Sequence, residues 1–474
     1  MKNYFLGVDV GTTGARAMLV DESGNVIASH SESIESSFVE SSKAEFSEQD
    51  PRLWRTPLLN VIRGVVKNID KELIRGICFD STSGTIIPVD ENASPLTNAF
   101  MHNDVRAREE AEYIREVLGI TVKPSFAISK ILWIKNNMPD IFEKTACFIH
   151  AADYIRGIVS GNYFITDFSN AVKTGYNLEN ERWPEAIESK LGIPLTKLPE
   201  VVPTGMVIGN IPTKAAEELG ISPETKVVAG ATDSTTSFYS SGAEKLGDWN
   251  TTLGTVLGIR GIAEKFIPDP QGLLYTHKHP EGYWLPGAAS NTGGEALRMF
   301  FGRDLELYDR QIESMDPTGA VIYPLVRKSE KFPFYSSDAT GFIVMDDLNP
   351  ARLFRGFIEG ISYVERLIYE KIEEIGYRVN DNIFSMGGGA YSLPWMEIRA
   401  SVMSRSISRA KVVETAFGAA VIAASGVLYK NLTEAIDNMV KIEKVVYPDD
   451  RLTVIYEENY QKFIHECRKR GYLS

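Results

Sequence analysis

The sequence predicts an α/β protein with two domains of similar size that face a shared cleft. A chain of 474 residues is longer than one hydrophobic core usually sustains, which favours two domains. A strand, a Gly-Thr turn and a second strand occur in each half, and stretches typical of amphipathic helices follow them. With 43% hydrophobic and 24% charged residues, both domains have the composition of folded globular protein.

The first half opens on β-strands. Residues 4–9, 17–20 and 26–28 are apolar and β-prone, and two turns separate them, which indicates a three-stranded antiparallel meander. The first turn, Gly11-Thr12-Thr13-Gly14, joins a strand to a strand. The two familiar phosphate-binding glycine loops instead join a strand to a helix, and their residue spacing is also absent here.

Further strands and helices follow in order. Strands are expected at 74–79 and 85–89, around the hydroxyl-rich turn Asp80-Ser-Thr-Ser-Gly84, and helices at 105–118 and 126–137. From Lys226 the strand and turn pattern begins again, with strands at 227–229, 249–252 and 256–259. We therefore place the two domains at residues 1–243 and 244–474, because small and charged residues between 240 and 247 separate the two patterns.

The second half combines helices with one glycine-rich turn. Helices are expected at 291–301, at 350–376 and, at the end of the chain, at 456–470. A strand at 383–386 leads into Gly387-Gly388-Gly389, and a helix begins near Pro394.

Charge and cysteine content exclude several classes of protein. The net charge of -13 argues against nucleic acid or an anionic membrane as the main partner. The first residues run directly into a strand without a basic and apolar leader, and no apolar run reaches membrane-spanning length, so we expect a cytoplasmic protein. Cys78, Cys147 and Cys467 have no metal-ligand spacing and are expected to be reduced thiols.

Asp9 is the first candidate site residue. It ends a buried strand, where an unpaired carboxylate is costly unless it meets a cation or hydrogen-bond donors. Magnesium is one answer, and a turn-capping role is the structural alternative. Thr12 and Thr13 add donors suited to phosphate oxygens, and Arg16 adds a positive charge close by.

Asp233 is the second candidate. It follows Gly-Ala-Thr at a strand end near the middle of the chain, where a cleft between two domains would open. A carboxylate there can accept the proton of an attacking hydroxyl, as the base of a kinase does. The alternative is an N-cap for the helix that follows, and both roles can hold together.

Two other polar segments suit ligand binding. Gly387-Gly388-Gly389-Ala390 enters a helix and would let an adenine or ribose approach the backbone, although glycine triplets also occur in plain turns. His102, Asn103, Asp104 and Arg106 form a dense polar cluster that suits recognition of several hydroxyls, with surface solvation as the alternative.

From residue 4 to about residue 428 the ordered set of motifs resembles the FGGY family of carbohydrate kinases. GVDVGTTGAR looks like the first phosphate motif of that family, GATDS like the segment with its catalytic base, and NTTLGT like its second phosphate motif. RGFIEGISYVER resembles the long helix of its C-terminal domain. GGGAYSLPW and ETAFGAAVIAA are similar to its adenosine motif and the helix behind it.

The resemblance implies two ribonuclease H-like domains, of the actin, Hsp70 and hexokinase superfamily, that close on MgATP and a sugar. By matching position, Asp233 would be the catalytic base and Asp9 would hold magnesium or lie in the substrate region. The implied nucleotide-binding residues are Thr12, Thr13, Arg16, Gly254, Thr255, Gly293, Gly388, Gly389 and Ala390. The implied substrate-binding residues are Asp9, Thr82, Ser83, Asp104 and Asp233.

The substrate turn differs from those of the best-known members of the family. Xylulokinases usually have Gly-Gln-Met-His-Gly and glycerol kinases an Arg-Glu pair, whereas this chain has Asp-Ser-Thr-Ser-Gly-Thr at 80–85 and HNDVRA at 102–107. These segments look more like the D-ribulose kinase and xylulose kinase-like subgroup, which implies a ketopentose such as D-ribulose or xylulose. Another polyol, a ketotetrose or a ketohexose stays open as the substrate. So does a non-catalytic nucleotide switch of the same superfamily, and the sequence also leaves open whether the protein is a homodimer.

Overall fold

The computed structural model describes residues 2–41, 43–269 and 271–473. Its described residues form two compact units. The first contains Met1–Ser240, His277–Gly282 and Glu414–Met439, and the second contains Ser241–Thr276, Tyr283–Val413 and Val440–Ser474. Each unit is built on its own central β-sheet flanked by helices.

The first unit has a six-stranded central sheet in the order β12-β13-β6-β1-β2-β3. Its strands are β1 (Tyr4–Val10), β2 (Gly14–Asp21), β3 (Val26–Ser33), β6 (Ile74–Ser81), β12 (Val207–Asn210) and β13 (Lys226–Thr232). β1, β2 and β3 pair antiparallel, whereas β6 runs parallel to both β1 and β13. A smaller sheet holds β4 (Phe38–Val39), β5 (Glu48–Gln49), β8 (Ala99–Phe100), β7 (Ile86–Val89) and β9 (Cys147–His150), and β10 (Ile165–Asp167) pairs with β11 (Glu200–Val202).

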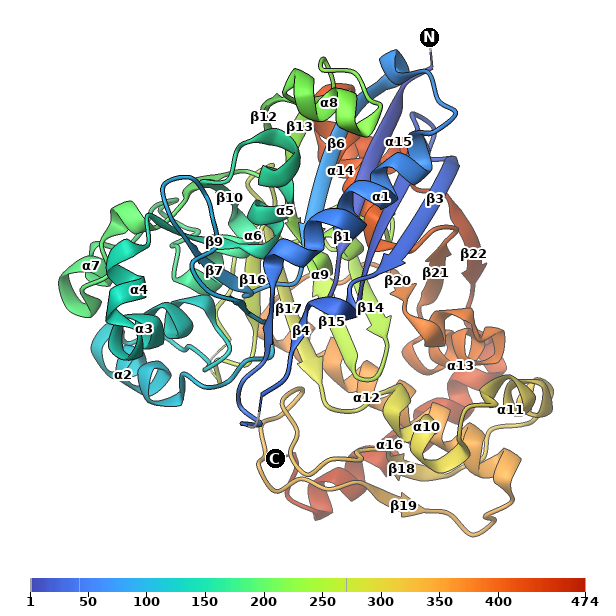
Figure 1. Ribbon diagram of the computed structural model, residues 1–474. Helices are drawn as coiled ribbons and strands as arrows, with labels where there is room; N and C mark the ends of the chain where they lie inside the picture. The colour runs from blue at the N-terminus through green and yellow to red at the C-terminus, as the bar shows by residue number, and fades with distance from the viewer. Residues whose placement is uncertain (1, 42, 270, 474) are drawn as a thin grey trace. The chain divides into compact units, whose positions relative to one another are not determined.

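The helices of the first unit are α1 (Arg55–Val66), α2 (Arg108–Leu118), α3 (Ala127–Asn137), α4 (Pro139–Lys144), α5 (Ala151–Ser160), α6 (Phe168–Ala171), α7 (Glu185–Leu191), α8 (Thr213–Leu219), α9 (Asp233–Tyr239), α14 (Thr415–Val427) and α15 (Leu432–Met439). Some of them, such as α1 and α14, cover the two faces of the central sheet, and others, such as α3, pack against the smaller sheet. Leu6 and Val8 of β1 share a hydrophobic core with residues of α1 and α5 (Figure 1). Side chains alternate between the two faces along a strand, so the Cβ position of Gly7 lies on the opposite face from Leu6 and Val8.

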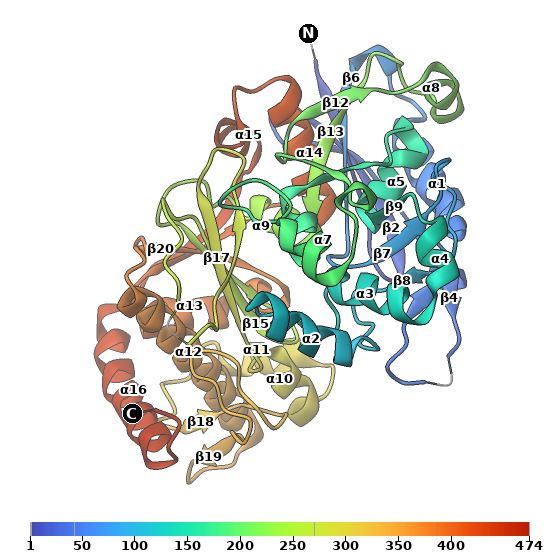
Figure 2. The same cartoon turned by 90° about the vertical axis from the view of Figure 1, so that its left-hand side faces the viewer.

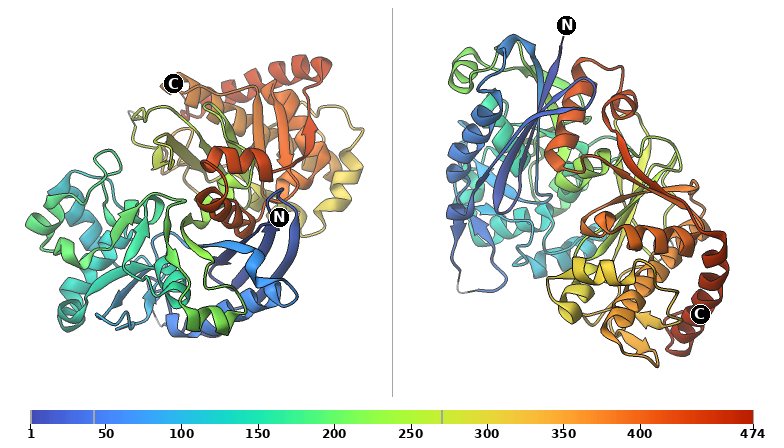
Figure 3. Two further views of the ribbon diagram at one scale, coloured as in Figure 1. Left: turned by 90° about the horizontal axis from the view of Figure 1, so that it is seen from above. Right: turned by 90° about the vertical axis from the view of Figure 1, so that its right-hand side faces the viewer.

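α14 packs closely against the face of the sheet that Gly7 occupies. A Cβ added to Gly7 would lie 1.8 Å from the carbonyl oxygen of Ala416, so only glycine fits there. Gly418 has the same function toward α9, where an added Cβ would lie 2.1 Å from the Thr236 oxygen. The right-hand view of Figure 3 shows this helix beside the blue strands. The late segment that carries α14 thereby belongs to the first unit.

The second unit repeats the strand order of the first. Its sheet has the order β16-β17-β15-β14-β20-β21-β22, with β14 (Trp249–Leu253), β15 (Leu257–Gly261), β16 (Tyr275–Lys278), β17 (Trp284–Ser290), β20 (Asn382–Met386), β21 (Ser406–Ala410) and β22 (Ile442–Val446). β14, β15 and β17 pair antiparallel, and β20 runs parallel to β14 and β21, as β6 does to β1 and β13. Its other elements are α10 (Gly294–Phe301), α11 (Leu305–Ile312), α12 (Pro350–Ile375), α13 (Leu393–Met403), α16 (Asp450–Lys469) and the pair β18 (Val321–Tyr323) and β19 (Phe342–Val344) (Figure 2).

Most sequence expectations for the fold are confirmed. The mixed α/β class and the opening meander hold, as do the helices expected near 105–118, 126–137 and 350–376. One interpretation is wrong: β13 does not begin the second pattern but belongs to the central sheet of the first unit, since it pairs with β6. The division of the chain at 243 and 244 stays a prediction.

Smaller differences concern a helix end and the strands around the substrate turn. The last helix begins at Asp450 rather than near residue 456, because the side chain of Asp449 caps it by accepting from Arg451 N and Leu452 N. β6 and β7, on either side of the Asp80 turn, lie in different sheets.

All three cysteines are free and buried. Among the described residues, we find no helix with the length and apolar character that crossing a bilayer requires.

Candidate functional site

Three aspartates lie at the carboxyl ends of three neighbouring strands in the first unit. Asp9 of β1 pairs in register with Asp80 of β6, and Asp80 pairs with Ala231 of β13, two residues before Asp233. Because β1, β6 and β13 are parallel, their carboxyl ends meet at one edge of the sheet, where ligands of open α/β sheets bind. The sheet therefore brings Asp9 and Asp233 together and adds Asp80 between them.

Burial and mutual repulsion raise the pKa values of two carboxyl groups of this cluster, Asp9 and Asp80. Desolvation raises the pKa of Asp9 from 3.8 to about 6, the negative charges of Asp233 and Glu414 add to the rise, and Asp80 and Arg16 oppose it. Asp80 is fully buried, and its pKa is raised well above its usual value by burial and by the neighbouring Asp9. Among the described residues, no donor group is positioned to form a hydrogen bond with either carboxyl oxygen of Asp80. Strongly raised pKa values of this kind are typical of functional sites.

Asp233 is the first residue of α9 and follows Thr232, which occupies the N-cap position. Its Oδ1 accepts a 2.6 Å hydrogen bond from Ser234 N, and its side chain is half-buried. The backbone before it is held from a second element, because Thr232 N donates to Ser169 Oγ at 2.7 Å. Ser169 Oγ donates in turn to the buried Asp167 at 2.6 Å. Asp233 therefore lies on a strand-to-helix turn that the rest of the unit fixes.

The turn after β1 presents Thr12 and Thr13 near the same edge. The carbonyl oxygen of Thr12 accepts from Gln49 Nε2 at 2.8 Å, and that of Thr13 accepts from Ile34 N at 3.0 Å. These bonds anchor the backbone of the turn and leave the side chain of Thr12 half-buried and that of Thr13 exposed. Arg16 pairs in register with Asp9 but forms an ion pair with Glu414, at the N-cap of α14. Its guanidinium thus already has a carboxylate partner.

The other expected substrate residues lie around the loop after β6. Thr82 is buried, with its Oγ1 2.7 Å from Thr85 Oγ1, whereas the buried Ser83 Oγ has no hydrogen-bond partner among the described residues. Asp104 is fully buried and accepts from Ser47 N at 2.7 Å and from Arg106 Nη2 at 2.7 Å. Its contacts are those of a residue that holds its own loop in place, and its role in substrate binding stays a prediction.

In the second unit the structure brings Gly254 and Thr255 together with Gly293. The turn after β14 packs backbone to backbone on the loop before α10, since Gly294 N donates to Gly254 O at 2.9 Å. A Cβ on Gly293 would lie 2.6 Å from Val256 Cα, so this close approach requires glycine. Thr255 is exposed at the tip of the turn.

The three glycines after β20 differ in their surroundings. Gly387 has φ +80, which favours glycine. Gly388 is exposed, and a Cβ there would meet no atom within 4 Å. A Cβ on the buried Gly389 would lie 2.7 Å from the Trp395 ring, and Ala390 is buried as well. Within this loop, only Gly388 has a backbone that a ligand could approach without displacing a side chain. That Gly388, Gly389 and Ala390 contact the nucleotide remains a prediction.

Sequence reasoning missed three residues that organise these loops. Asp80 has the same signal in the sequence as Asp9, a carboxylate at the end of a buried strand, but only the hydroxyl residues of its turn were predicted to bind a ligand. Ser169 has no signal in a single sequence. Glu330, fully buried, accepts from Ser290 Oγ at 2.8 Å and from Asn291 N at 2.7 Å, and so fixes the loop before α10.

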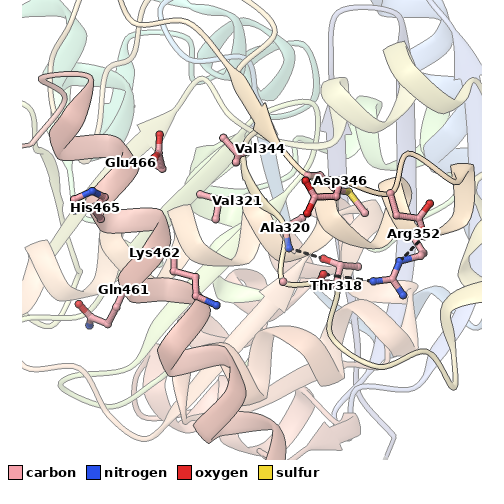
Figure 4. A pocket seen from close by; sticks show the side chains of 13 residues that line it. Thr318, Ala320, Val321, Val344, Asp346, Arg352, Gln461, Lys462, His465 and Glu466 are labelled. Atoms are coloured by element: carbon pink, nitrogen blue, oxygen red, sulfur yellow. Dashed lines mark hydrogen bonds and ion pairs between the residues drawn. The ribbon is translucent and has the colours of Figure 1, made fainter.

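A separate pocket of about 700 Å³ lies in the second unit, between the 318–321 segment, the 344–352 segment and α16 (Figure 4). Its polar lining includes Thr318, Asp346, Arg352, Lys462 and His465. It contains none of the residues that the sequence singled out.

The carboxylate cluster fits a magnesium ion that is only partly held by protein. The described residues contain no group of three or more His, Cys, Asp or Glu side chains arranged to bind a metal. Mg²⁺ usually binds one or two carboxylates together with water and substrate phosphates. The carboxyl groups of Asp80 and Asp9 have the oxygen chemistry that Mg²⁺ prefers, so the residues present fit this ion.

The chain is similar in sequence and in fold to known kinases. The chain is 26% identical to a xylulose kinase of Staphylococcus epidermidis, over 98% of this chain and 96% of that protein. It is 28% identical to a gluconokinase of Bacillus subtilis, over 86% of this chain and 84% of that protein. The crystal structure of a xyloylose kinase from Brucella ovis has the same fold, with a TM-score of 0.88 at 22% identity over 100% of both chains.

Models of two domains match most of the chain. Residues 4–239 match the N-terminal domain of the FGGY family of carbohydrate kinases, and residues 262–427 match its C-terminal domain. The chain therefore belongs to the FGGY family of carbohydrate kinases.

Proposed function

We propose that this carbohydrate kinase transfers the γ-phosphate of MgATP to a hydroxyl of a ketopentose, with D-ribulose or xylulose as substrate. The observation that carries the proposal is the convergence of Asp9, Asp80 and Asp233 at one edge of the first central sheet. Phosphoryl transfer needs a proton acceptor for the attacking hydroxyl and a cation beside the phosphates. In a carboxylate cluster, one carboxylate can accept the proton while others would hold Mg²⁺.

Asp233 is the proposed base. Its carboxylate accepts the proton of the substrate hydroxyl as the oxygen forms a bond to the γ-phosphorus, while the bond between that phosphorus and the β,γ-bridging oxygen breaks. The products are the sugar phosphate and ADP. The half-buried position of Asp233 and the Ser169 tether behind it suit a base that must be both accessible and fixed.

Asp9 and Asp80 are the proposed magnesium ligands. A bound Mg²⁺ would neutralise charge on the phosphates of ATP and so stabilise the transition state. Burial makes the negative charge of both side chains costly, and Arg16 offsets only part of this cost at Asp9, so a bound cation would stabilise the charged forms. Thr12 and Thr13 of the first unit, with Thr255 and Gly388 of the second, are the proposed contacts of the phosphates and the nucleoside.

The substrate class is supported by the relatives and by the loop after Asp80. The xylulose kinase of Staphylococcus epidermidis matches 98% of this chain. A ketopentose is also the substrate that the resemblance of the Asp-Ser-Thr-Ser-Gly turn suggests. The gluconokinase at 28% identity makes D-gluconate a second candidate.

A coupled assay of ADP release tests the proposal. Purified protein with MgATP is offered D-ribulose, D-xylulose, L-ribulose, erythrulose, fructose, glycerol and D-gluconate, and the substrates are ranked by kcat/KM. Phosphorus NMR of the product identifies the phosphorylated hydroxyl. We expect a ketopentose to rank first. If gluconate, glycerol, erythrulose or fructose exceeds all three ketopentoses by tenfold or more, the proposed substrate is wrong.

We further propose that the reaction takes place in the cytoplasm, in accord with three buried free thiols. A homodimer stays a prediction, which light scattering on the purified protein tests.

A further inference from the structure

A second group of polar side chains surrounds the loop that follows Asp80 in the first unit. Ser83 Oγ and His102 Nδ1 are both buried and have no hydrogen-bond partner among the described residues. Lys173, just after α6, donates from Nζ to the carbonyl oxygen of Ser83 at 3.2 Å. Burial and the positive charges of Lys130 and Lys173 lower the pKa of His102, which favours the neutral form of its ring. A neutral imidazole offers one donor and one acceptor.

The two lysines of this group have different environments. Lys130 is fully buried, and its Nζ donates at 2.7 Å to the carbonyl oxygens of both Gly84 and Met101, so it holds two loops together. Lys173 is only half-buried. Gly84 has φ +89, and a Cβ there would lie 3.2 Å from Lys173 Cδ, so glycine at this position also leaves room for the Lys173 side chain. The Ser83-Gly84 segment therefore contacts Lys173 through a hydrogen bond and through close packing at Gly84.

Two short chain segments connect this group to the carboxylate cluster. Ser83 follows Asp80 by three residues, and three residues span at most ~10 Å. Lys173 lies four residues after Ser169 in the sequence. The hydroxyl oxygen of Ser169 accepts a hydrogen bond from the backbone amide of Thr232, the residue before Asp233. Short chain segments therefore connect the Ser83 hydroxyl and the Lys173 ammonium to the carboxylate cluster.

We propose that Lys173, with Ser83 and His102, binds the end of the sugar opposite the hydroxyl that is phosphorylated. The Lys173 ammonium donates a charge-assisted hydrogen bond to an oxygen of that end, and Ser83 Oγ and the neutral His102 ring bind adjacent hydroxyls. Lys173 is then a residue that determines substrate specificity. The inference rests on the proposed function, because it assigns part of the same substrate site.

The test compares the wild-type protein with Lys173→Met, which keeps the length of the side chain but removes its charge and donors. Lys173→Arg keeps both charge and donors. Lys190→Met is the matched control, since Lys190 in α7 also donates to a backbone carbonyl, that of Val117. Each protein is assayed with the best ketopentose and with the deoxy analogue that lacks the terminal hydroxyl opposite the phosphorylated one.

We expect Lys173→Met to raise the KM for the sugar by at least tenfold while the KM for ATP changes less than twofold. The wild-type protein should prefer the ketopentose over its deoxy analogue by at least tenfold in kcat/KM, and this preference should fall below threefold in Lys173→Met. Lys173→Arg should recover part of it, and Lys190→Met should match wild type. A merely structural lysine would not change the preference between two substrates.

An unchanged sugar KM, or an unchanged preference in a Lys173→Met protein with wild-type circular dichroism, would overturn the assignment. If the substrate panel identifies a carbohydrate other than a ketopentose, the same variants are assayed on that carbohydrate and its deoxy analogue. The substrate proposal then fails alone, and the role of Lys173 is decided by the same ratio.

Discussion

The buried carboxylate of Asp9 should make the protein less stable than it would be with a neutral side chain. The pKa of Asp9 rises from 3.8 to about 6 on folding, mainly because burial disfavours its charge. At about 1.4 kcal/mol for each pH unit, this rise corresponds to about 3 kcal/mol. Asp9→Asn removes the charge and nearly keeps the shape, so we expect the variant to gain about 2–3 kcal/mol at pH 7.5 while it loses activity.

The gain should depend on pH in a defined direction. Below pH 3.8 the side chain is protonated in both the folded and the unfolded chain, and its charge contributes no penalty. Between pH 3.8 and about 6 the unfolded chain releases the proton and the folded chain keeps it, so the free energy of unfolding falls as pH rises. Above pH 6 the penalty is constant.

Urea unfolding of wild type and Asp9→Asn at pH 7.5 and pH 4, in buffer with EDTA, measures this difference. The control is Glu91→Gln, which changes an exposed carboxylate on a turn. The variant should exceed wild type in stability at pH 7.5 and approach it at pH 4. Equal stabilities at pH 7.5, or the same difference at both pH values, would refute the proposed burial penalty.

Three further predictions concern activity. The kcat/KM for the sugar should fall as pH drops below about 6, because Asp9 then binds a proton, and a pH–rate profile flat down to pH 5 would contradict this. Gly388→Val should raise the KM for ATP without lowering the Tm, whereas Gly389→Val should lower the Tm because it clashes with Trp395. An unchanged ATP KM would remove Gly388 from the site. Ser169→Ala should lower kcat about tenfold with the ATP KM unchanged, since Thr232 N loses its acceptor, and Ser169→Thr should keep most of the activity. Equal kcat in both variants would show that the tether does not matter.

Local patterns in the sequence were enough to predict the opening meander and two members of the carboxylate cluster. The apolar, β-prone segments within residues 4–28 and the turns between them are local signals, and Asp9 and Asp233 stand out as charges at the ends of apolar strands. Asp80 has the same signal, yet its place between the other two depends on strand order, which a single sequence does not encode locally.

Long-range packing could not be predicted. Residues 415–427 are apolar on all sides and rich in alanine and glycine, which indicates a buried helix but not the sheet that it covers. Only the structure shows that Gly7 and Gly418 allow it to lie against β1 and α9 of the first unit. For the same reason β13 was taken for the start of a second pattern, because a strand carries no mark of its partner.

The kinetic effect of Asp233→Ala tests the central claim most directly. General bases contribute on the order of 100- to 10,000-fold. We therefore expect kcat with the best sugar to fall by that factor, while calorimetry shows ATP binding within twofold of wild type. The control Asp437→Asn, at an exposed position of α15, should leave both unchanged. A folded Asp233→Ala protein with kcat within about threefold of wild type would contradict the assignment of Asp233 as the base.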